Sequence, residues 1–339
     1  MKVLHVLNTN SYSGAENVAI TIINHMPNVD CVYLSLNGSI SDILQKNNIQ
    51  YYPIDKLSIK SLKKAIKEIH PDIIHAHDYT ASILCALCFP KAKIISHIHN
   101  NSPWIKSYGI YSWAYLFSSL FYKKILTVSN SIENEYVFGK LIRNKVECIG
   151  NPTDIELIHK KAIEYKVNKK YDVIFLGRLT PPKNPDLLIE VFKMLVPIKS
   201  DIKIAVVGAG DQYESFKENV HINKLQDNIE MYGFVENPYP ILNASKIMIL
   251  PSKWEGYGLV AVEALSLGVP VICSGAGGLK TIVNSSCGKI CKTRDDYVKE
   301  IINLLNDGQS YFIKSNNAKE RAKVFGDIDG YISRIRKAY

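Results

Sequence analysis

Two glutamates stand on either side of a glycine-rich turn, Glu255 and Glu263 in the segment PSKWEGYGLVAVEALSLGVPVI. Gly256 and Gly258 lie between them, and an apolar helical pattern surrounds the second glutamate. A glycine-broken loop that runs into a helix offers unpaired backbone N–H groups and the positive end of a helix dipole to a phosphate. Carboxylates beside that anion accept hydrogen bonds from sugar hydroxyls. The segment therefore predicts a nucleotide-sugar site. The alternative is that Glu263 is simply a capping or solvated residue of an ordinary amphipathic helix.

Two basic residues follow another apolar run, in the segment VIFLGRLTPPKNPDLLIEVF. Arg178 comes directly after Gly177, and Lys183 follows five positions later. Breaking a sugar–phosphate bond leaves growing negative charge on the diphosphate, and two fixed cations stabilise that charge by short hydrogen bonds. The alternative for Lys183 is an ordinary surface lysine.

The elements that must hold these residues form two successive α/β series. Short apolar runs, typical of buried strands, alternate with helical or loop segments. A sequence of this length suits two domains, with a lysine-rich, Asn- and Pro-containing linker near residues 151–170. We expect an α/β protein with two doubly wound parallel sheets, in domains 1–164 and 165–325. The first series has runs at 2–7, 31–36, 73–77, 93–99 and 124–129, and the second at 171–179, 202–208, 246–252 and 269–275.

This combination resembles the E-x7-E signature of the retaining glycosyltransferases of the GT-B fold, in the large family numbered four. The resemblance implies two Rossmann-like domains facing across a cleft, with a terminal helix at 326–339 that packs back on the first domain. It implies that Arg178 and Lys183 bind the donor diphosphate, that Glu263 holds the ribose hydroxyls, and that Glu255 lies near the transferred hexose as the candidate nucleophile. The implied donor-binding set is Gly14, Gly177, Arg178, Lys183, Gly256, Tyr257, Gly258, Leu259, Glu263, Gly277 and Gly278.

The chain departs from the family pattern at three positions. Asn184 replaces a glycine after Lys183, which bears on the geometry of that loop. Lys280 and Thr281 replace a Pro–Glu pair after the glycines at 277 and 278, so only the two glycines are carried over.

Histidines mark the strand ends of the first domain. His97 and His99 close the run KIISHIH, and the resemblance places His99 against the donor sugar as a catalytic residue. His75, His77 and Asp78 close another run and could meet the acceptor together with His97, or be structural. No metal-ligand spacing such as H-E-x-x-H accompanies them, so we expect no metal and no cofactor.

Composition excludes several partners and settings. The formal net charge of +9 is spread over both halves without a basic, aromatic-lined stripe, so nucleic acid is disfavoured. Scattered cysteines in odd number, and no apolar leader, indicate a cytoplasmic setting. Cys85 and Cys88 are expected in the core. No apolar run reaches the roughly 20 residues that span a bilayer.

Two segments could nevertheless meet the inner face of the plasma membrane. Residues 58–70 place Ile59, Leu62, Ile66 and Ile69 at helical spacing among lysines, and residues 102–124 concentrate aromatic side chains before two lysines. Aromatics with basic neighbours suit an anionic lipid interface. The alternatives are a solvated cover helix and a packed core segment.

We therefore expect a retaining transferase that moves a hexose or N-acetylhexosamine from a nucleotide sugar, with UDP favoured over GDP. The expected acceptor is a glycan on a polyprenyl carrier, in bacterial capsule, lipopolysaccharide or other surface polysaccharide synthesis. One alternative is a nicotinamide-dependent oxidoreductase, because IAVVGAGDQY begins like a dinucleotide fingerprint, although Tyr213 replaces its third glycine. Another is a non-catalytic nucleotide-sugar-binding protein.

Overall fold

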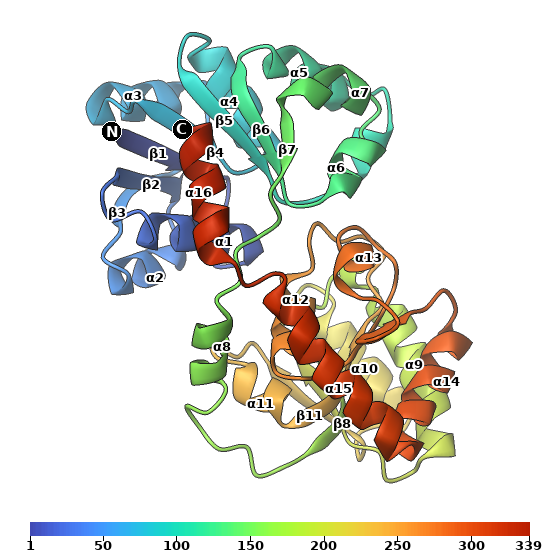
Figure 1. Ribbon diagram of the computed structural model, residues 1–339. Coiled ribbons are helices and arrows are strands. Elements are labelled where there is room, and N and C mark those ends of the chain that lie inside the picture. The colour runs from blue at the N-terminus through green and yellow to red at the C-terminus, as the bar shows by residue number, and fades with distance from the viewer. The chain divides into compact units, whose positions relative to one another are not determined.

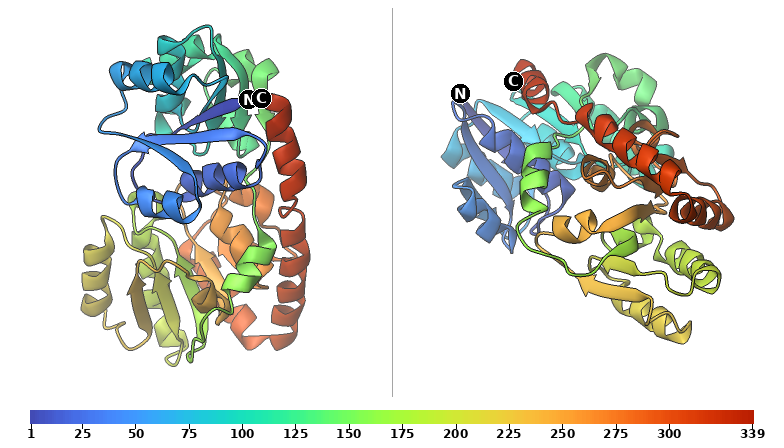
Figure 2. Two further views of the ribbon diagram at one scale, coloured as in Figure 1. Left: turned by 90° about the vertical axis from the view of Figure 1, so that its left-hand side faces the viewer. Right: turned by 60° about the horizontal axis from the view of Figure 1, so that its bottom comes forward.

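The computed structural model describes residues 1–339 and divides the chain into two compact units (Figures 1 and 2). Unit 1 comprises Met1–Pro152 together with Ile328–Tyr339, and unit 2 comprises Thr153–Asp327. In both views of Figure 2 the two ends of the chain lie near each other, within unit 1.

Unit 1 is built on a seven-stranded, wholly parallel sheet. In spatial order its strands are β3 (Gln50–Ile54), β2 (Asp30–Leu36), β1 (Lys2–Val6), β4 (Ile73–Ala76), β5 (Lys93–Ile98), β6 (Tyr122–Thr127) and β7 (Val146–Cys148). Its helices are α1 (Gly14–Asn24), α2 (Ile40–Lys46), α3 (Ile59–Ile69), α4 (Tyr79–Cys88), η1 (Pro103–Lys106), α5 (Ile110–Ser119), α6 (Asn130–Glu135), α7 (Gly139–Ile142), η2 (Arg143–Lys145) and α16 (Ile328–Ala338).

Unit 2 repeats this plan with a six-stranded parallel sheet. Its strands in spatial order are β10 (Ile229–Gly233), β9 (Ile204–Val207), β8 (Tyr171–Leu176), β11 (Ser245–Leu250), β12 (Val271–Cys273) and β13 (Gly288–Ile290). Its helices are α8 (Ile155–Lys161), η3 (Pro181–Lys183), α9 (Pro185–Ile198), α10 (Tyr213–Ile222), α11 (Tyr239–Asn243), α12 (Leu259–Ser266), α13 (Leu279–Ile282), α14 (Arg294–Asn306) and α15 (Gly308–Lys323). The expected α/β class with two doubly wound parallel sheets is confirmed.

Each sheet reverses its strand order at one place. In unit 1 the first strand, β1, lies between β2 and β4, and in unit 2 the first strand, β8, lies between β9 and β11. Ligands of doubly wound sheets bind beyond the carboxyl ends of the strands at this switch point, because the connections on either side diverge there. The loops after β1 and β4, and those after β8 and β11, are therefore the first places to look for a site.

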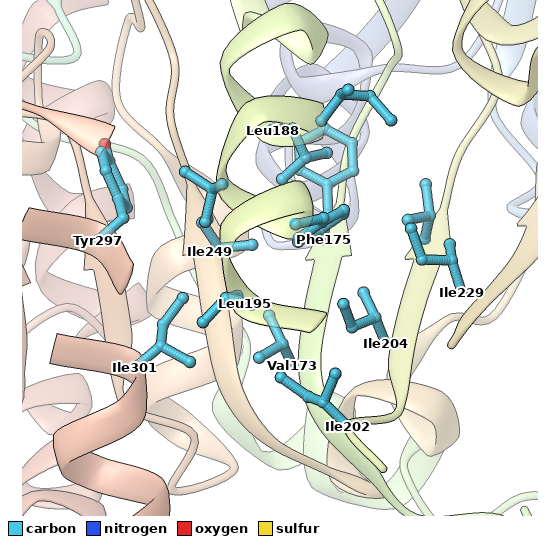
Figure 3. Close-up of a cluster of buried hydrophobic side chains, with 14 of the residues drawn as sticks. Val173, Phe175, Leu188, Leu195, Ile202, Ile204, Ile229, Ile249, Tyr297 and Ile301 are labelled. Atoms are coloured by element: carbon cyan, nitrogen blue, oxygen red, sulfur yellow. The ribbon is translucent and has the colours of Figure 1, made fainter. Parts of the chain in front are cut away.

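A dense apolar core holds β8 and β11 in place (Figure 3). Phe175 of β8, Ile249 of β11 and Leu188 of α9 are all fully buried in one cluster. Burying a side chain of this size contributes roughly 1.5–3 kcal/mol. The strand ends that carry Gly177 and Pro251 are consequently anchored to a rigid support.

The boundary between the units falls earlier than the sequence suggested. The expected division was at 164/165, whereas the chain passes from unit 1 to unit 2 at 152/153. Helix α8 accounts for the difference, since His159 Nε2 lies 2.9 Å from the Ser266 carbonyl oxygen in unit 2. At the other end, α16 belongs to unit 1, where Figure 1 shows it (red) against the blue strands.

The two segments considered for lipid contact differ in burial. Leu62 and Ile69 of α3 are buried, so the apolar stripe of that helix is taken up largely by the core of unit 1. In the aromatic segment, Tyr115 and Tyr122 are also buried, whereas most of the other large side chains are exposed. None of the helices combines the length and apolar content that a bilayer span needs.

Candidate active site

The loops after β8 and β11 are fastened to each other at the switch point of unit 2. The Lys253 N–H donates to the Pro182 carbonyl at 2.8 Å, and the Asn184 side-chain amide donates to the Pro251 carbonyl at 3.2 Å. Asn184 has a left-handed backbone with φ of 58°. Apart from glycine, asparagine is one of the residues that adopt this conformation most readily. The replacement of the family's glycine by Asn184 therefore preserves the turn and adds a hydrogen bond.

Lys183 and Glu255 form an ion pair where these loops meet. The Lys183 ammonium donates to Oε2 of Glu255, and Ser252 Oγ lies 3.5 Å from the same oxygen. The two side chains are only 17% and 15% exposed. A lysine ammonium has three donors, so Lys183 can hold Glu255 and still offer N–H groups to an incoming anion.

A third loop, after β12, packs backbone to backbone on the turn that contains Glu255. The Gly278 N–H donates to the Gly256 carbonyl at 3.1 Å. Gly277 has φ of 50°, and a Cβ on it would lie 1.6 Å from the Glu255 carbonyl oxygen. A side chain at 277 is therefore excluded by both backbone conformation and space. The expected glycine-rich loop is thus a required part of the Glu255 turn.

Glu263 lies on α12, the helix that begins directly after this turn. Gly258 caps the helix with a left-handed φ of 99°. Tyr239 Oη donates to Oε1 of Glu263 at 3.2 Å. Burial raises the pKa of Glu263 to about 7, against the opposing effects of this hydrogen bond and of the Lys161 charge. The carboxyl group thus titrates near neutral pH.

The other residues expected in this site differ in how far they are buried. Arg178 is exposed at the start of the loop that ends in Lys183, and its side chain has no ion-pair partner. Tyr257 is buried with 8% exposure, and its ring packs edge to face on Phe325 at 6.4 Å between centroids. Leu259 is the partly buried first residue of α12. Tyr239 was missed, because no motif in the sequence marks α11.

The glycines that resemble a dinucleotide fingerprint, Gly208 and Gly210, are required by the packing of the chain. Gly208 follows β9, the second strand of unit 2, rather than the first strand as in dinucleotide-binding folds. A Cβ on Gly208 would lie 2.0 Å from the Gly177 carbonyl oxygen, and one on Gly210 would lie 2.3 Å from that of Leu179. These glycines therefore let two backbones approach, which removes the main argument for a nicotinamide enzyme.

In unit 1, acidic side chains fix the loops at the switch point. Buried Glu16 accepts hydrogen bonds from Thr9 and from Ser13 Oγ, the latter at 2.5 Å, and so holds the loop that precedes Gly14 at the start of α1. Asp78 caps α4 through the Ala81 N–H at 2.7 Å and accepts from the Asn8 N–H at 3.2 Å. Asp78 therefore connects the start of α4 to the loop after β1.

Five histidines are packed together at the carboxyl ends of β1, β4 and β5. His5 Nδ1 lies 2.9 Å from His77 Nε2, His77 Nδ1 lies 3.0 Å from His99 Nε2, and His75 Nε2 lies 3.1 Å from His97 Nδ1. Burial lowers the pKa of His5 to about 3, and that of His99 to about 3 against a raising effect of Asn151. It also lowers the pKa of His75, His77 and His97, so the cluster is neutral.

The histidine cluster contains two groups of candidate metal ligands. His5, His75 and His77, or His77, His97 and His99, are close enough to share an ion. The ring nitrogens, however, are mostly engaged with one another in hydrogen bonds, which a metal would have to break. In unit 2 the only carboxylate at the loops, Glu255, is already paired with the Lys183 cation.

Sequence comparison assigns both units to described families. The model of "Glycosyltransferase Family 4" matches residues 38–157, and that of "Glycosyl transferases group 1" matches residues 158–324. The O-antigen biosynthesis glycosyltransferase WclY of Escherichia coli is 28% identical over 81% of this chain and 80% of its own length. A UDP-Gal:alpha-D-GlcNAc-diphosphoundecaprenol alpha-1,3-galactosyltransferase of E. coli is 26% identical over 100% of this chain and 96% of its own.

Structure comparison agrees with this assignment at the level of the fold. The Anabaena protein Alr3699/HepE in complex with UDP-glucose has a TM-score of 0.87 at 20% identity, over 99% of this chain and 98% of its own. The lipopolysaccharide outer core galactosyltransferase WaaB has a TM-score of 0.72 at 17% identity, over 100% and 99% of the two chains. The fold is that of the GT-B proteins.

Proposed function

Because this chain belongs to the family 4, group 1 glycosyltransferases, we propose that it transfers a hexose or N-acetylhexosamine from a UDP-sugar to a glycan acceptor in surface polysaccharide synthesis. One observation carries the donor half of this proposal. Lys183, Glu255 and the glycine turn that leads into α12 meet at the switch point of unit 2, where a doubly wound sheet binds its ligand.

The roles of the residues follow from their charges. Lys183 and Arg178 neutralise the donor diphosphate, and the backbone N–H groups at the start of α12 and at Gly277 face its oxygens, whereas the Gly278 N–H is bonded to the Gly256 carbonyl. Glu263 accepts hydrogen bonds from the ribose hydroxyls. These cations take the place that a metal ion has in other transferases, so the reaction needs no cofactor.

For the chemical step we propose retention of configuration by a same-face route. The bond from the sugar C1 to the phosphate oxygen breaks, the acceptor oxygen bonds to C1 from the same face, and the acceptor's proton passes to the departing phosphate. Lys183 and Arg178 accelerate this step because they stabilise charge that grows only as the bond breaks. Glu255, held by Lys183, is the alternative nucleophile of a covalent route.

UDP is preferred to GDP in this proposal, and the acceptor is lipid-linked. The support comes from the galactosyltransferase relative, whose name states a UDP-sugar donor and a diphosphoundecaprenol acceptor, and from the HepE complex with UDP-glucose. We therefore propose only the class of substrate, a UDP-sugar and a lipid-linked acceptor, and the assays below identify the sugar.

A surface of unit 1 suits docking to anionic lipid, on the inner face of the plasma membrane. Around α5, large apolar side chains stand out of the protein, and Tyr108, Ile110 and Leu120 are 72%, 79% and 70% exposed. Patches of this kind on a folded protein mark interaction sites. The wider group also contains Tyr111, Trp113, Phe117, Phe121 and Leu141, with Lys106, Lys123 and Lys140 nearby in the sequence.

Thermal shift with a panel of UDP- and GDP-sugars tests the donor, because a ligand at a hundred times its Kd adds about 2.7 kcal/mol of stability. The ligands that stabilise the protein are then assayed for slow hydrolysis and for transfer to a polyprenyl-diphosphate-linked sugar. Stabilisation without turnover would support a binding protein, and stabilisation by NADH instead would support the oxidoreductase.

Co-sedimentation with liposomes tests the membrane surface. We expect binding to anionic vesicles that Phe117→Ser weakens, while Phe234→Ser, which removes a 72% exposed phenylalanine from unit 2, leaves binding unchanged. Equal, negligible binding to neutral and anionic vesicles would end this part of the proposal.

A further inference from the structure

The five histidines and Tyr339 form one continuous chain of side-chain contacts. Tyr339 Oη lies 2.8 Å from His75 Nδ1 and 3.5 Å from His5 Nε2, so this hydroxyl connects two branches of imidazoles. One branch continues from His75 to His97 at 3.1 Å. The other continues from His5 to His77 at 2.9 Å and from His77 to His99 at 3.0 Å. The two ring nitrogens left over, His97 Nε2 and His99 Nδ1, are both buried at the ends of the chain.

Neutral imidazoles in such a chain cannot choose their tautomers independently. Each neutral ring has one N–H donor and one bare nitrogen acceptor, and a tyrosine hydroxyl has one hydrogen to donate. If every contact is a hydrogen bond and Tyr339 donates its hydrogen to one of the two histidines, all donors must point the same way along the chain. The other arrangement, in which Tyr339 accepts from both His75 and His5, leaves the hydroxyl hydrogen without an imidazole acceptor and is therefore costlier. The proton of His99 is therefore on Nδ1 when donors run from His97 through Tyr339 to His99, and on Nε2 when they run in reverse.

Asn151 decides between the two directions. Its Oδ1 is a buried acceptor without a hydrogen bond, as is Nδ1 of His99, yet Asn151 raises the pKa of His99, so the two side chains stand close enough to interact. An Nδ1–H on His99 supplies the donor that this oxygen lacks. The opposite direction would place a bare nitrogen opposite a bare oxygen and would leave an N–H without an acceptor at His97 Nε2, which is the costlier arrangement.

We propose that Tyr339 is a positioning residue that selects the tautomer of His99 with its proton on Nδ1, opposite Asn151. Tyr339 acts through three hydrogen bonds in sequence, by way of His5 and His77, and does not touch His99 itself. Asn151 lies next to Pro152, where the chain leaves unit 1, and Tyr339 follows α16, which begins where the chain re-enters unit 1. The chain of imidazoles thus connects the two segments that make up unit 1, Met1–Pro152 and Ile328–Tyr339.

The consequence for catalysis rests on the proposed function. If His99 lines the sugar site, its ring orientation is held by bonds to both nitrogens, from His77 on one side and Asn151 on the other. The nitrogens then serve to orient the ring and leave its remaining edge for the substrate.

Long-range ¹H–¹⁵N spectra of ¹⁵N-histidine-labelled protein test the tautomer directly, since protonated and bare ring nitrogens resonate far apart. His99 is assigned by the signal that His99→Gln removes. We expect Nδ1 of His99 to be the protonated nitrogen in the wild type and in Tyr331→Phe, which removes a hydroxyl from another buried tyrosine of α16. In Tyr339→Phe the two branches are disconnected, and the tautomer ratio of His99 should shift by about fivefold, the effect of one neutral hydrogen bond.

Two results would overturn the inference: a bare Nδ1 on His99 in the wild type, or an unchanged tautomer ratio in Tyr339→Phe. Thermal unfolding of each variant shows whether it is folded. The kcat for sugar transfer should fall in Tyr339→Phe with donor binding unchanged. If the wild type transfers no sugar, the proposed function fails, while the spectra still decide the tautomer question.

Discussion

The neutral histidine cluster predicts a specific loss of stability in mild acid. His5 is fully buried and has a pKa of about 3 in the folded chain, against an ordinary value of 6.5. Between these two pH values the unfolded ring is protonated and the folded ring is not, so unfolding takes up a proton. The contribution of His5 to stability is therefore fully present above pH 6.5 and is lost as the pH falls from 6.5 toward 3.

The size of the effect follows from the shift. A pH of about 5 lies about 1.5 units below the pKa of the unfolded ring. This difference corresponds to a loss of about 2 kcal/mol in the free energy of unfolding for His5 alone. His75, His77 and His97 act in the same direction, because burial lowers their pKa too. Asp78 opposes them, since burial raises the pKa of its carboxyl group.

A substitution at His5 separates its contribution from the others. His5→Gln keeps a neutral side chain with a donor and an acceptor but cannot be protonated. In a Trp254→Phe background the remaining tryptophans, Trp104 and Trp113, both report on unit 1. Urea unfolding followed by fluorescence at about pH 7.5 and about pH 5 then gives the two free energies of unfolding. We expect the loss between these pH values to be about 2 kcal/mol smaller in the His5→Gln protein. Equal losses in both proteins would show that His5 is charged or solvated in the folded state, and would refute the reasoning.

Four further predictions concern the candidate site of unit 2. Gly277→Ala should abolish stabilisation by UDP-sugars, because its Cβ would overlap the Glu255 carbonyl oxygen, whereas Gly308→Ala, with no atom within 4 Å, should bind normally in the same thermal-shift assay. Lys183→Ala should lower the transfer rate about a hundredfold to a thousandfold, and Lys193→Ala, which breaks an exposed ion pair on α9, should leave the kinetics unchanged; equal rates would remove Lys183 from the mechanism. UDP affinity should rise by up to about tenfold as the pH passes upward through about 7, because an ionised Glu263 accepts stronger hydrogen bonds from the ribose, and calorimetry should find this dependence absent in Glu263→Gln. Transfer should survive EDTA, whereas a complete loss restored by Mg²⁺ would contradict the role given to the two cations.

The sequence predicted the central strands well and missed the outermost ones. The four strands absent from its apolar runs are β3, β7, β10 and β13, and these are the edges of the two sheets. A central strand in a doubly wound sheet is covered on both faces and therefore reads as a continuous apolar run. An edge strand such as β3, with the partly exposed sequence QYYPI, is under no such constraint. The apolar runs that predicted the strands reflect burial on both faces of a sheet, and this burial decreases toward the edge strands.

The same limit applies to the candidate site. Glu255, Lys183 and the glycines could be found because their spacing in a loop fixes much of their geometry. Tyr239 and Asn151 could not, since they approach Glu263 and His99 from segments distant in the sequence. The return of α16 to unit 1 was implied by the family resemblance and is confirmed, but the joining of five histidines through Tyr339 was not predicted, because no spacing in the sequence marks it.

The interlocked loops at Glu255 limit how donor choice can be changed by engineering or evolution. The turn at 255–258 and the loop at 274–278 meet through main-chain atoms at Gly277 and Gly278, so a side chain added at either glycine would displace the turn. New sugar preferences should therefore be sought among side chains that border this frame, in libraries that leave its glycines untouched.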